Sequence, residues 1–440
     1  MSLKTFLTPR ISQWLLSRER LLRQRAQAER RRLRSGAPHE LLYFHQVDDP
    51  YSALAAQSLS RLTQRYDVHL QPFLVPPPRD DVAPERERLV AYSRSDAQWL
   101  ARRHGLWFQD PGHQPAATAV ERISHELWVA IETGTFAQRA PELSRALWES
   151  AGEHLPEAAE HLNAGTRLTD HLRQADERRQ RLGHYLGATF YYGGEWYWGI
   201  DRLHHLEKRL QALGAQRQAS LQPALLFPPL PELPPQPLLG AGLPRPTLEF
   251  FFSFRSPYSA IVAPRVFELA RQTGAQVQLR YVLPMVMRGL PVPRSKRRYI
   301  SLDTAREAHE RGIDFGRLQD PVGRPTERGL SLMPLAERHG RGQAYVLAFM
   351  HAVWAQGVDA GSDRGLRQIV EAAGLPWNEA REALHDPTWR EIAEDNRKAL
   401  FAAGLWGVPS FRTGNVAVWG QDRLSRIQEE LLRMWQEAQA

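Results

Sequence analysis

The chain contains two similar segments in tandem, and this internal repeat limits its fold more than any other feature of the sequence. A Pro-Tyr-Ser-Ala motif at 50–53 recurs 207 positions later, at 257–260. A Trp-Gly-X-Asp-Arg-Leu motif at 198–203 recurs 221 positions later, at 419–424. A repeat of this length duplicates a whole domain, and 440 residues suit two or three domains of ordinary size.

The chain has no cysteine. Disulfides, thiolate metal sites and a dithiol redox couple are therefore excluded, and any thiol in its chemistry must arrive as a ligand. The sixteen histidines are scattered without metal-ligand spacing, so we predict no metal site. No apolar run reaches the roughly 20 residues that span a bilayer, and a secretory signal pattern is missing. We expect a soluble, cytoplasmic protein.

The net charge of +8 is concentrated at the N-terminus. Residues 1–36 contain ten Lys or Arg and two Glu, which accounts for the whole excess. The spacing of the apolar residues predicts a basic amphipathic helix over residues 10–34. Such a helix packs on the body of the protein or on a partner; contact with an anionic membrane surface or with nucleic acid is the alternative. No aromatic residues are interleaved in the centre of the basic run, so we predict no specific nucleic-acid partner.

A proline-rich stretch separates the two copies. Nine prolines fall between residues 223 and 246, a density that prevents helix and favours extended polyproline II. We therefore predict a linker over 213–246, between an N-terminal copy at 37–212 and a C-terminal copy at 247–440. The apolar residues between the prolines indicate that the linker lies along a surface. A ligand for a proline-reading partner is the alternative.

The C-terminal copy has a readable order of strands and helices. The expected elements are strands at 247–254 and 276–283, helices at 258–273 and 421–438, a helical stretch over 298–403 and a hairpin about Thr413-Gly414. The first strand-helix-strand unit should be parallel and right-handed, with the hairpin extending the same sheet.

That order, with a Val-Pro pair before the hairpin, is typical of a thioredoxin fold with an all-helical insertion. The C-terminal copy resembles the 2-hydroxychromene-2-carboxylate isomerases and kappa-class glutathione transferases, within the DsbA-like superfamily. Four motifs in the family order carry the resemblance, at 251–259, 296–306, 404–411 and 419–423. The resemblance implies an α/β protein with two tandem thioredoxin-like domains, each with an all-helical insertion, preceded by the basic helix. The two copies would imitate, within one chain, the dimers that family members form.

Ser256 stands between a predicted strand and a helix that begins near Pro257. Its hydroxyl should lie near the unpaired backbone N–H groups of a helix N-terminus, which favour an anion and lower the pKa of a thiolate held there. A serine that only caps the helix, worth about 1 kcal/mol, explains the residue equally well. The resemblance implies the functional role, since family members use this serine on the sulfur of glutathione.

The resemblance also implies a set of residues that bind glutathione. A cis bond between Val408 and Pro409 would turn the Val408 N–H and C=O toward the tripeptide, whereas a trans proline opening an edge strand is the commoner arrangement. Asp422 and Arg423 open the last helix, where the carboxylate caps the helix or receives the γ-glutamyl ammonium. Lys296 meets a carboxylate of glutathione or of an acidic substrate, or lies on a solvated helix face.

The N-terminal copy has lost several of these side chains. It has Asp49, Leu89 and Ala188 where the C-terminal copy has Ser256, Lys296 and Pro409. A carboxylate at position 49 would repel a thiolate, so we predict a degenerate copy with a structural or partner-presenting role. The Asp-Arg pair at 201–202 is nevertheless kept, which indicates that these positions also serve folding. Within the C-terminal copy, Arg288 stands where relatives commonly have a lysine, and the asparagine that follows in them is missing.

These observations predict a glutathione-dependent isomerase or transferase, with glutathione as cosubstrate and a small aromatic or other conjugated carboxylic acid as substrate. As the resemblance implies, a thiolate at Ser256 would add reversibly to an unsaturated carbon, allow bond rotation and be expelled. The alternative is a non-catalytic scaffold, or a peptide-binding protein, that presents the basic helix and the linker to a partner. Calorimetry with glutathione distinguishes the two, because only the first should give heat.

Overall fold

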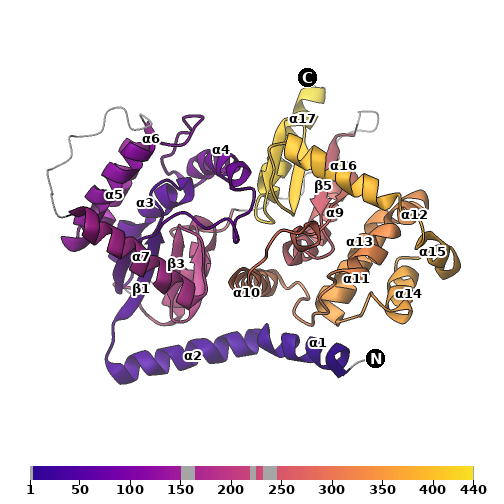
Figure 1. The fold of residues 1–440 in the computed structure, drawn as a ribbon, viewed down its shortest axis with the longest axis horizontal. Helices are drawn as coiled ribbons and strands as arrows, with labels where there is room; N and C mark the ends of the chain where they lie inside the picture. The colour runs from indigo at the N-terminus through magenta and orange to yellow at the C-terminus, as the bar shows by residue number, and fades with distance from the viewer. Residues whose placement is uncertain (1–2, 150–163, 219–223, 231–244, 440) are drawn as a thin grey trace. The chain divides into compact units, whose positions relative to one another are not determined.

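The computed structural model describes residues 3–149, 164–218, 224–230 and 245–439 (Figure 1). The chain divides into two compact units. The C-terminal unit comprises Met1–Leu21, Pro231–Val292 and Ile300–Ala440, and the N-terminal unit comprises Leu22–Leu230 and Pro293–Tyr299. Each unit is built around one four-stranded mixed sheet. The predicted α/β class, with two tandem thioredoxin-like domains, is confirmed.

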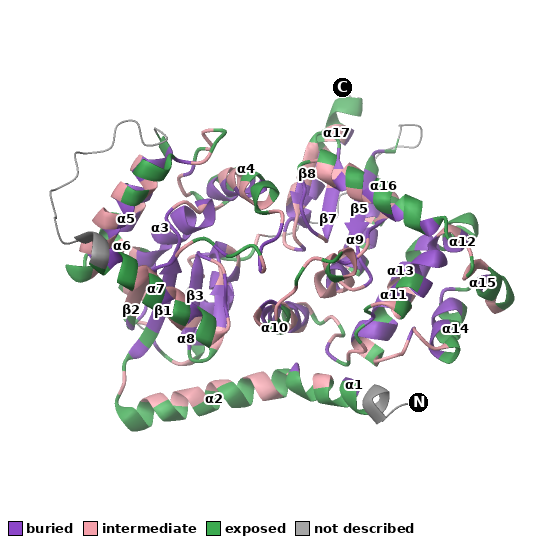
Figure 2. Ribbon diagram, viewed as in Figure 1, coloured by how far each residue is buried: buried purple, intermediate pink, exposed green. Residues whose placement is uncertain are grey.

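The sheet of the C-terminal unit has the strand order β6-β5-β7-β8. Its strands are β5 (Thr247–Phe252), β6 (Gln276–Tyr281), β7 (Ser410–Thr413) and β8 (Val416–Trp419). β5 pairs with β6 in parallel and with β7 antiparallel, and β7 pairs with β8 as the predicted hairpin. The central strand β5 carries a run of phenylalanines and is buried (Figure 2). The predicted order of strands is confirmed; β5 and β6 begin where predicted and end two residues earlier.

Helices cover this sheet and fill the predicted insertion. They are α9 (Pro257–Thr273), α10 (Arg294–Arg311), α11 (Arg324–Ser331), α12 (Met333–Arg338), α13 (Gly342–His351), α14 (Asp363–Ala372), α15 (Trp377–Ala383), α16 (Trp389–Ala402) and α17 (Leu424–Gln439). α9 connects β5 to β6 and ends at Gly274, whose φ of 66° lies in the left-handed region that glycine tolerates. The core beneath it is aromatic: Phe254 stacks on Phe349 at a centroid distance of 4.0 Å.

The N-terminal unit repeats this plan with the strand order β2-β1-β3-β4. Its strands are β1 (His39–His45), β2 (Val68–Leu74), β3 (Thr189–Tyr192) and β4 (Glu195–Trp198). Its helices are α3 (Pro50–Arg65), α4 (Arg86–His104), α5 (Ala117–Glu132), α6 (Phe136–Glu149), α7 (Ala164–Leu182) and α8 (Leu203–Ala212). α3 takes the place of α9, so the head of α3 is the counterpart of the Ser256 position.

The basic N-terminal segment forms two helices, α1 (Leu3–Leu15) and α2 (Arg18–Ser35), where the apolar spacing predicted one. The break has a local cause, because the Ser17 hydroxyl accepts a hydrogen bond from the N–H of Arg20 at 3.1 Å and so begins a new helix. In the C-terminal unit, Ser12 Oγ accepts from the N–H of Leu318 at 2.9 Å. In the N-terminal unit, Arg25 pairs with Glu195 at 2.7 Å. Each helix is therefore attached to one of the units by at least one polar contact.

Neither of these helices, nor any other helix in the described ranges, combines the length and apolarity needed to cross a bilayer. The predicted linker over 213–246 falls mostly outside the described residues. Its described part does lie along a surface, as expected. The carboxylate of the buried Glu207 accepts from the N–H groups of Leu226 and Phe227 at 2.9 and 3.0 Å, and the Phe227 side chain is buried.

Candidate functional site

Ser256 is the N-cap of α9, as predicted. Its Oγ accepts a hydrogen bond from the N–H of Ser259 at 3.1 Å and donates to the carbonyl of Val408 at 3.4 Å. Pro257 occupies the first position of the helix, where its missing N–H has no cost. The half-buried hydroxyl thus stands at the positive end of a 17-residue helix, a place that favours an anion.

The Val408–Pro409 bond is cis, as the resemblance implies. The carbonyl of Pro409 accepts from the N–H of Gly420 at 2.9 Å, which joins this bend to the turn after β8. That turn contains Asp422 and Arg423, whose side chains form an ion pair at 3.2 Å, and α17 begins only after them. Hydrogen bonds therefore connect Ser256 to Val408, and Pro409 to the turn that contains Asp422 and Arg423.

Lys296 lies in the segment that belongs to the N-terminal unit. Its Nζ donates to the carbonyl of Val82 at 2.7 Å and lies 5.9 Å from the centroid of the Tyr185 ring. The side chain is buried, and burial lowers the pKa of Lys296 to about 8. The alternative of a solvated helix face is therefore wrong for this lysine, although Arg297 and Arg298 beside it are exposed. Its role toward a ligand carboxylate stays a prediction.

A tyrosine–aspartate pair with a buried carboxylate ties the first turn of α9 to α10. Tyr258 donates its hydroxyl to Asp303 Oδ2 at 2.7 Å, and Arg306 pairs with Asp303 Oδ1 at 2.5 Å. The N-terminal unit has the same pair, from Tyr51 to Asp96 at 2.8 Å. The equal spacing of 45 residues in both copies was the sequence signal for it. This pair fixes the helix end at which Ser256 stands.

Arg255, directly before Ser256, was not predicted as a site residue. Its guanidinium makes a bidentate pair with Asp320, at 2.9 and 3.0 Å. The Arg255 side chain is largely buried, whereas half of the Asp320 side chain is exposed. The cation is thus held in place by a carboxylate that solvent reaches. Arg288, the residue considered in place of the family lysine, lies with its guanidinium 5.5 Å from the Phe401 ring centroid.

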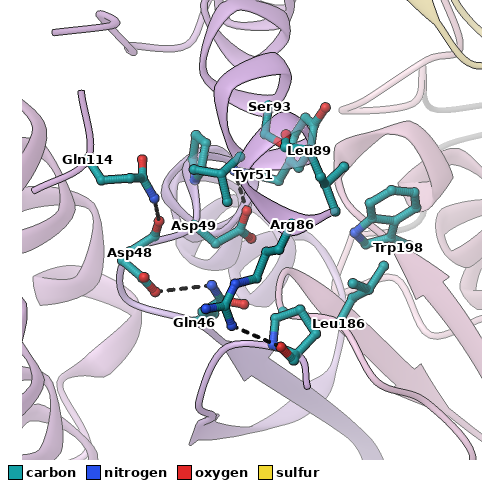
Figure 3. A pocket seen from close by; sticks show the side chains of 14 residues that line it. Gln46, Asp48, Asp49, Tyr51, Arg86, Leu89, Ser93, Gln114, Leu186 and Trp198 are labelled. Atoms are coloured by element: carbon teal, nitrogen blue, oxygen red, sulfur yellow. Dashed lines mark hydrogen bonds between the residues drawn. The ribbon is translucent and has the colours of Figure 1, made fainter. Parts of the chain in front are cut away.

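In the N-terminal unit, a pocket lies at the counterpart of the Ser256 position (Figure 3). Its walls include Asp48 and Asp49 at the head of α3, Arg86 and Leu89 of α4, and Trp198 of β4. Its volume is about 50 Å³, which is room for one or two water molecules. The degenerate role of this copy stays a prediction.

The Asp49 carboxylate is bound by its own chain. It is the N-cap of α3 and accepts from the N–H of Tyr51 at 3.3 Å, the N–H of Ser52 at 2.9 Å and the Ser52 hydroxyl at 2.8 Å. The Ser52 hydroxyl in turn accepts from the N–H groups of Gln46 and Ala188 at 3.1 and 2.9 Å. The anion site at this helix end is therefore filled by a carboxylate.

Gly187, at the counterpart of Val408, shows how closely this bend packs. A Cβ at Gly187 would lie 2.5 Å from Gln46 Cβ, so only glycine fits there. Ala188 follows with a φ of 52°, in the left-handed region where a non-glycine residue is uncommon. In the N-terminal copy, Gln46, directly after β1, thus packs against the backbone of Gly187. The C-terminal copy has a cis-proline at the equivalent bend.

Asp49→Asn is expected to change the pH dependence of the N-terminal unit. Burial raises the pKa of Asp49 to about 6, whereas the unfolded carboxyl titrates near pH 4. Between these values the folded state holds more protons, so this group lowers the stability of the unit as the pH rises from about 4 to about 6. Asparagine keeps the cap and cannot ionise. Relative to wild type, the variant should gain about 1–2 kcal/mol over this range.

Urea unfolding at a series of pH values, with hydrogen exchange of α3 as the local probe, measures this difference. Asp81→Asn is the control, because Asp81 makes an exposed ion pair with Arg79. Parallel pH profiles for wild type and Asp49→Asn would contradict the assignment.

Comparison with known proteins gives matches to the C-terminal copy. The family model of the DSBA-like thioredoxin domain matches residues 247–432. The 2-hydroxychromene-2-carboxylate isomerase of Sphingobium xenophagum is 26% identical over 193 residues, which are 42% of this chain and 98% of that protein. The isomerase of the same name from Pseudomonas putida is 24% identical over 195 residues, covering 42% of this chain and 95% of its own length.

Among solved structures, that of a selenomethionine 2-hydroxychromene-2-carboxylate isomerase matches with a TM-score of 0.38 and 22% identity. The match covers 43% of this chain and 97% of the isomerase. The residues that carry the geometry above, from Ser256 to Arg423, all lie inside the family match.

Proposed function

We propose that residues 247–432, which belong to the DsbA-like thioredoxin family, form an isomerase or transferase that uses the thiolate of glutathione on a small conjugated carboxylic acid. The observation that carries the proposal is the placement of the Ser256 hydroxyl, at the head of α9 and 3.4 Å from the Val408 carbonyl. The helix end that favours an anion thus lies next to the Val408 backbone, with which a peptide would pair. The isomerase names of the two relatives support the reaction class.

Ser256, Val408 and Asp422 would each bind a different part of glutathione. When bound, glutathione would supply a nucleophilic sulfur that adds reversibly to an unsaturated carbon of the substrate. Ser256 would donate its hydroxyl hydrogen to the sulfur, and the N-terminus of α9 would stabilise the negative charge, so that the thiol ionises at neutral pH. Val408 would pair with the extended tripeptide through its backbone. The carboxylate of Asp422, beside Arg423, would receive the γ-glutamyl ammonium.

Arg255, which precedes Ser256 in the chain, would bind a carboxylate of the substrate. Its guanidinium offers a planar pair of donors that already binds a carboxylate, that of Asp320. Because Asp320 is half exposed, an incoming carboxylate could exchange with it at little cost. This feature supports an acidic substrate.

Ser256→Ala should lower turnover by about 10²–10³-fold, because it removes a donor aimed at the developing anion. It should also lower the free energy of unfolding by about 1 kcal/mol through loss of the cap. Steady-state kinetics with glutathione and calorimetric titration measure the first effect, and urea unfolding measures the second.

Ser362→Ala is the matched control for this variant. Ser362 caps α14 with the same type of bond, from the N–H of Gly365 at 3.1 Å, so it should lose similar stability and keep full turnover. Turnover unchanged in Ser256→Ala would remove the serine from the reaction. No heat of glutathione binding to the folded wild type would favour the non-catalytic scaffold instead.

A further inference from the structure

Ser259, in the first turn of α9, has a buried hydroxyl without a hydrogen-bond partner among the described residues. Its side chain is fully buried, and its Oγ neither donates to nor accepts from any described group. Leaving such a hydroxyl unpaired costs about 1–3 kcal/mol, and buried polar groups are paired in the great majority of cases. This hydroxyl lies one helical turn after Ser256, whose own Oγ accepts from the Ser259 N–H.

The N-terminal unit shows what the equivalent hydroxyl binds. Ser52 is the counterpart of Ser259, and its Oγ donates to Asp49 Oδ2 at 2.8 Å while it accepts from the N–H of Ala188 at 2.9 Å. Both groups are changed in the C-terminal copy. Ser256 replaces Asp49; its neutral hydroxyl caps the Ser259 N–H at 3.1 Å but makes no hydrogen bond to the Ser259 hydroxyl. A proline, which has no N–H, replaces Ala188.

The two substitutions act on the same hydroxyl. In the N-terminal copy the acceptor of the serine proton is an anionic atom that also accepts from the Ser52 N–H, at 2.9 Å. The C-terminal copy keeps the donor, its burial and the helix N-terminus, but it has lost both the anionic acceptor and the N–H that Ala188 supplies. The changed residue, Ser256, is the one to which the proposed function assigns the thiolate.

We propose that Ser259 is a second hydroxyl donor to the bound thiolate, which would lie next to the Ser256 hydroxyl and accept from the Ser259 hydroxyl as Asp49 Oδ2 accepts from Ser52. This inference rests on the proposed function and deepens it. The sulfur would receive the protons of Ser256 and Ser259 together, two hydrogen bonds to a charged acceptor. A carboxylate in one copy and a thiolate in the other are then alternative occupants of the same anion site.

The test is a pH titration of glutathione bound to the full chain, followed by the ultraviolet absorbance of the thiolate. Ser259→Ala should raise the pKa of the bound thiol by about one unit relative to wild type, the size of one lost hydrogen bond to a charged group. The variant should unfold at the same urea concentration as wild type or a higher one, because it removes an unpaired buried hydroxyl. Ser52→Ala is the matched control and should leave the thiol pKa unchanged.

The outcomes separate this inference from the proposed function. If wild type lowers the thiol pKa and Ser259→Ala leaves that pKa unchanged, the role of Ser259 is overturned while the function stands. If Ser259→Ala instead unfolds much more easily than wild type, its hydroxyl has a structural partner and the inference is again overturned. If wild type shows no bound thiolate at all, the proposed function fails and the Ser259 assignment fails with it.

Discussion

Ser256→Asp is expected to abolish glutathione-dependent turnover, by about 10³-fold or more, while the C-terminal unit stays folded. Aspartate caps a helix as well as serine does, so the free energy of unfolding should change little. Asp49 shows the arrangement that the new carboxylate would adopt, accepting from the first N–H groups of α3 and from the Ser52 hydroxyl. In the C-terminal copy the carboxylate would take the acceptor position of the thiolate and repel it by like charge.

Calorimetric titration with glutathione and steady-state kinetics measure this effect, and urea unfolding verifies the fold. Asp49→Ser, the reverse change, is the control and should leave turnover unaffected, because the N-terminal pocket has a volume of only about 50 Å³. Near-normal turnover in Ser256→Asp would mean that no anion binds at the head of α9 during the reaction.

Asp303→Ala is expected to lower the free energy of unfolding of the C-terminal unit by about 3–5 kcal/mol. The Arg306 side chain, which is 8% exposed, would lose its ion pair with the Asp303 carboxylate at a buried position. Tyr258 would lose the acceptor of its hydroxyl proton at the same time. Because Tyr258 is in the first turn of α9, the position of Ser256 should loosen as well.

Hydrogen exchange of α9 and α10 in the full chain, together with urea unfolding, measures this change locally. Asp395→Ala is the matched control: Asp395 pairs with Lys398 at 3.0 Å with both side chains exposed, and such pairs contribute less than about 1 kcal/mol. The loss of unfolding free energy in Asp303→Asn should lie between the losses in Asp303→Ala and Asp395→Ala, since an amide oxygen still accepts from Tyr258. A loss below 1 kcal/mol in Asp303→Ala would show that the ion pair adds nothing net to stability.

Local signals predicted much of the fold and part of the candidate site. The strand, turn and helix around Ser256 follow from apolar alternation, from Pro257 and from the helix period, all of which act within a few residues. The hairpin of β7 and β8 likewise follows from Gly414, whose φ of 51° suits a tight turn. The cap at Ser256 was predictable for the same reason.

One local cap and the features that depend on tertiary packing were missed. The break between α1 and α2 at Ser17 was hidden, because the basic amphipathic pattern continues across it. The burial of Lys296 depends on contacts with Val82, more than two hundred residues earlier in the chain. Ser259 carried no signal, since both copies have serine at this position and only the residues around it differ.

The occupant of the N-terminal anion site is a side chain, and this has a consequence for how the two copies respond to their surroundings. A group attached covalently to the chain cannot dissociate, so that site stays saturated whatever the solute concentration. Under the proposed function, only the C-terminal copy exchanges its occupant with the solution and follows the cellular thiol level. Under the same proposal, the tandem repeat combines a permanently occupied copy with a responsive one in a single polypeptide.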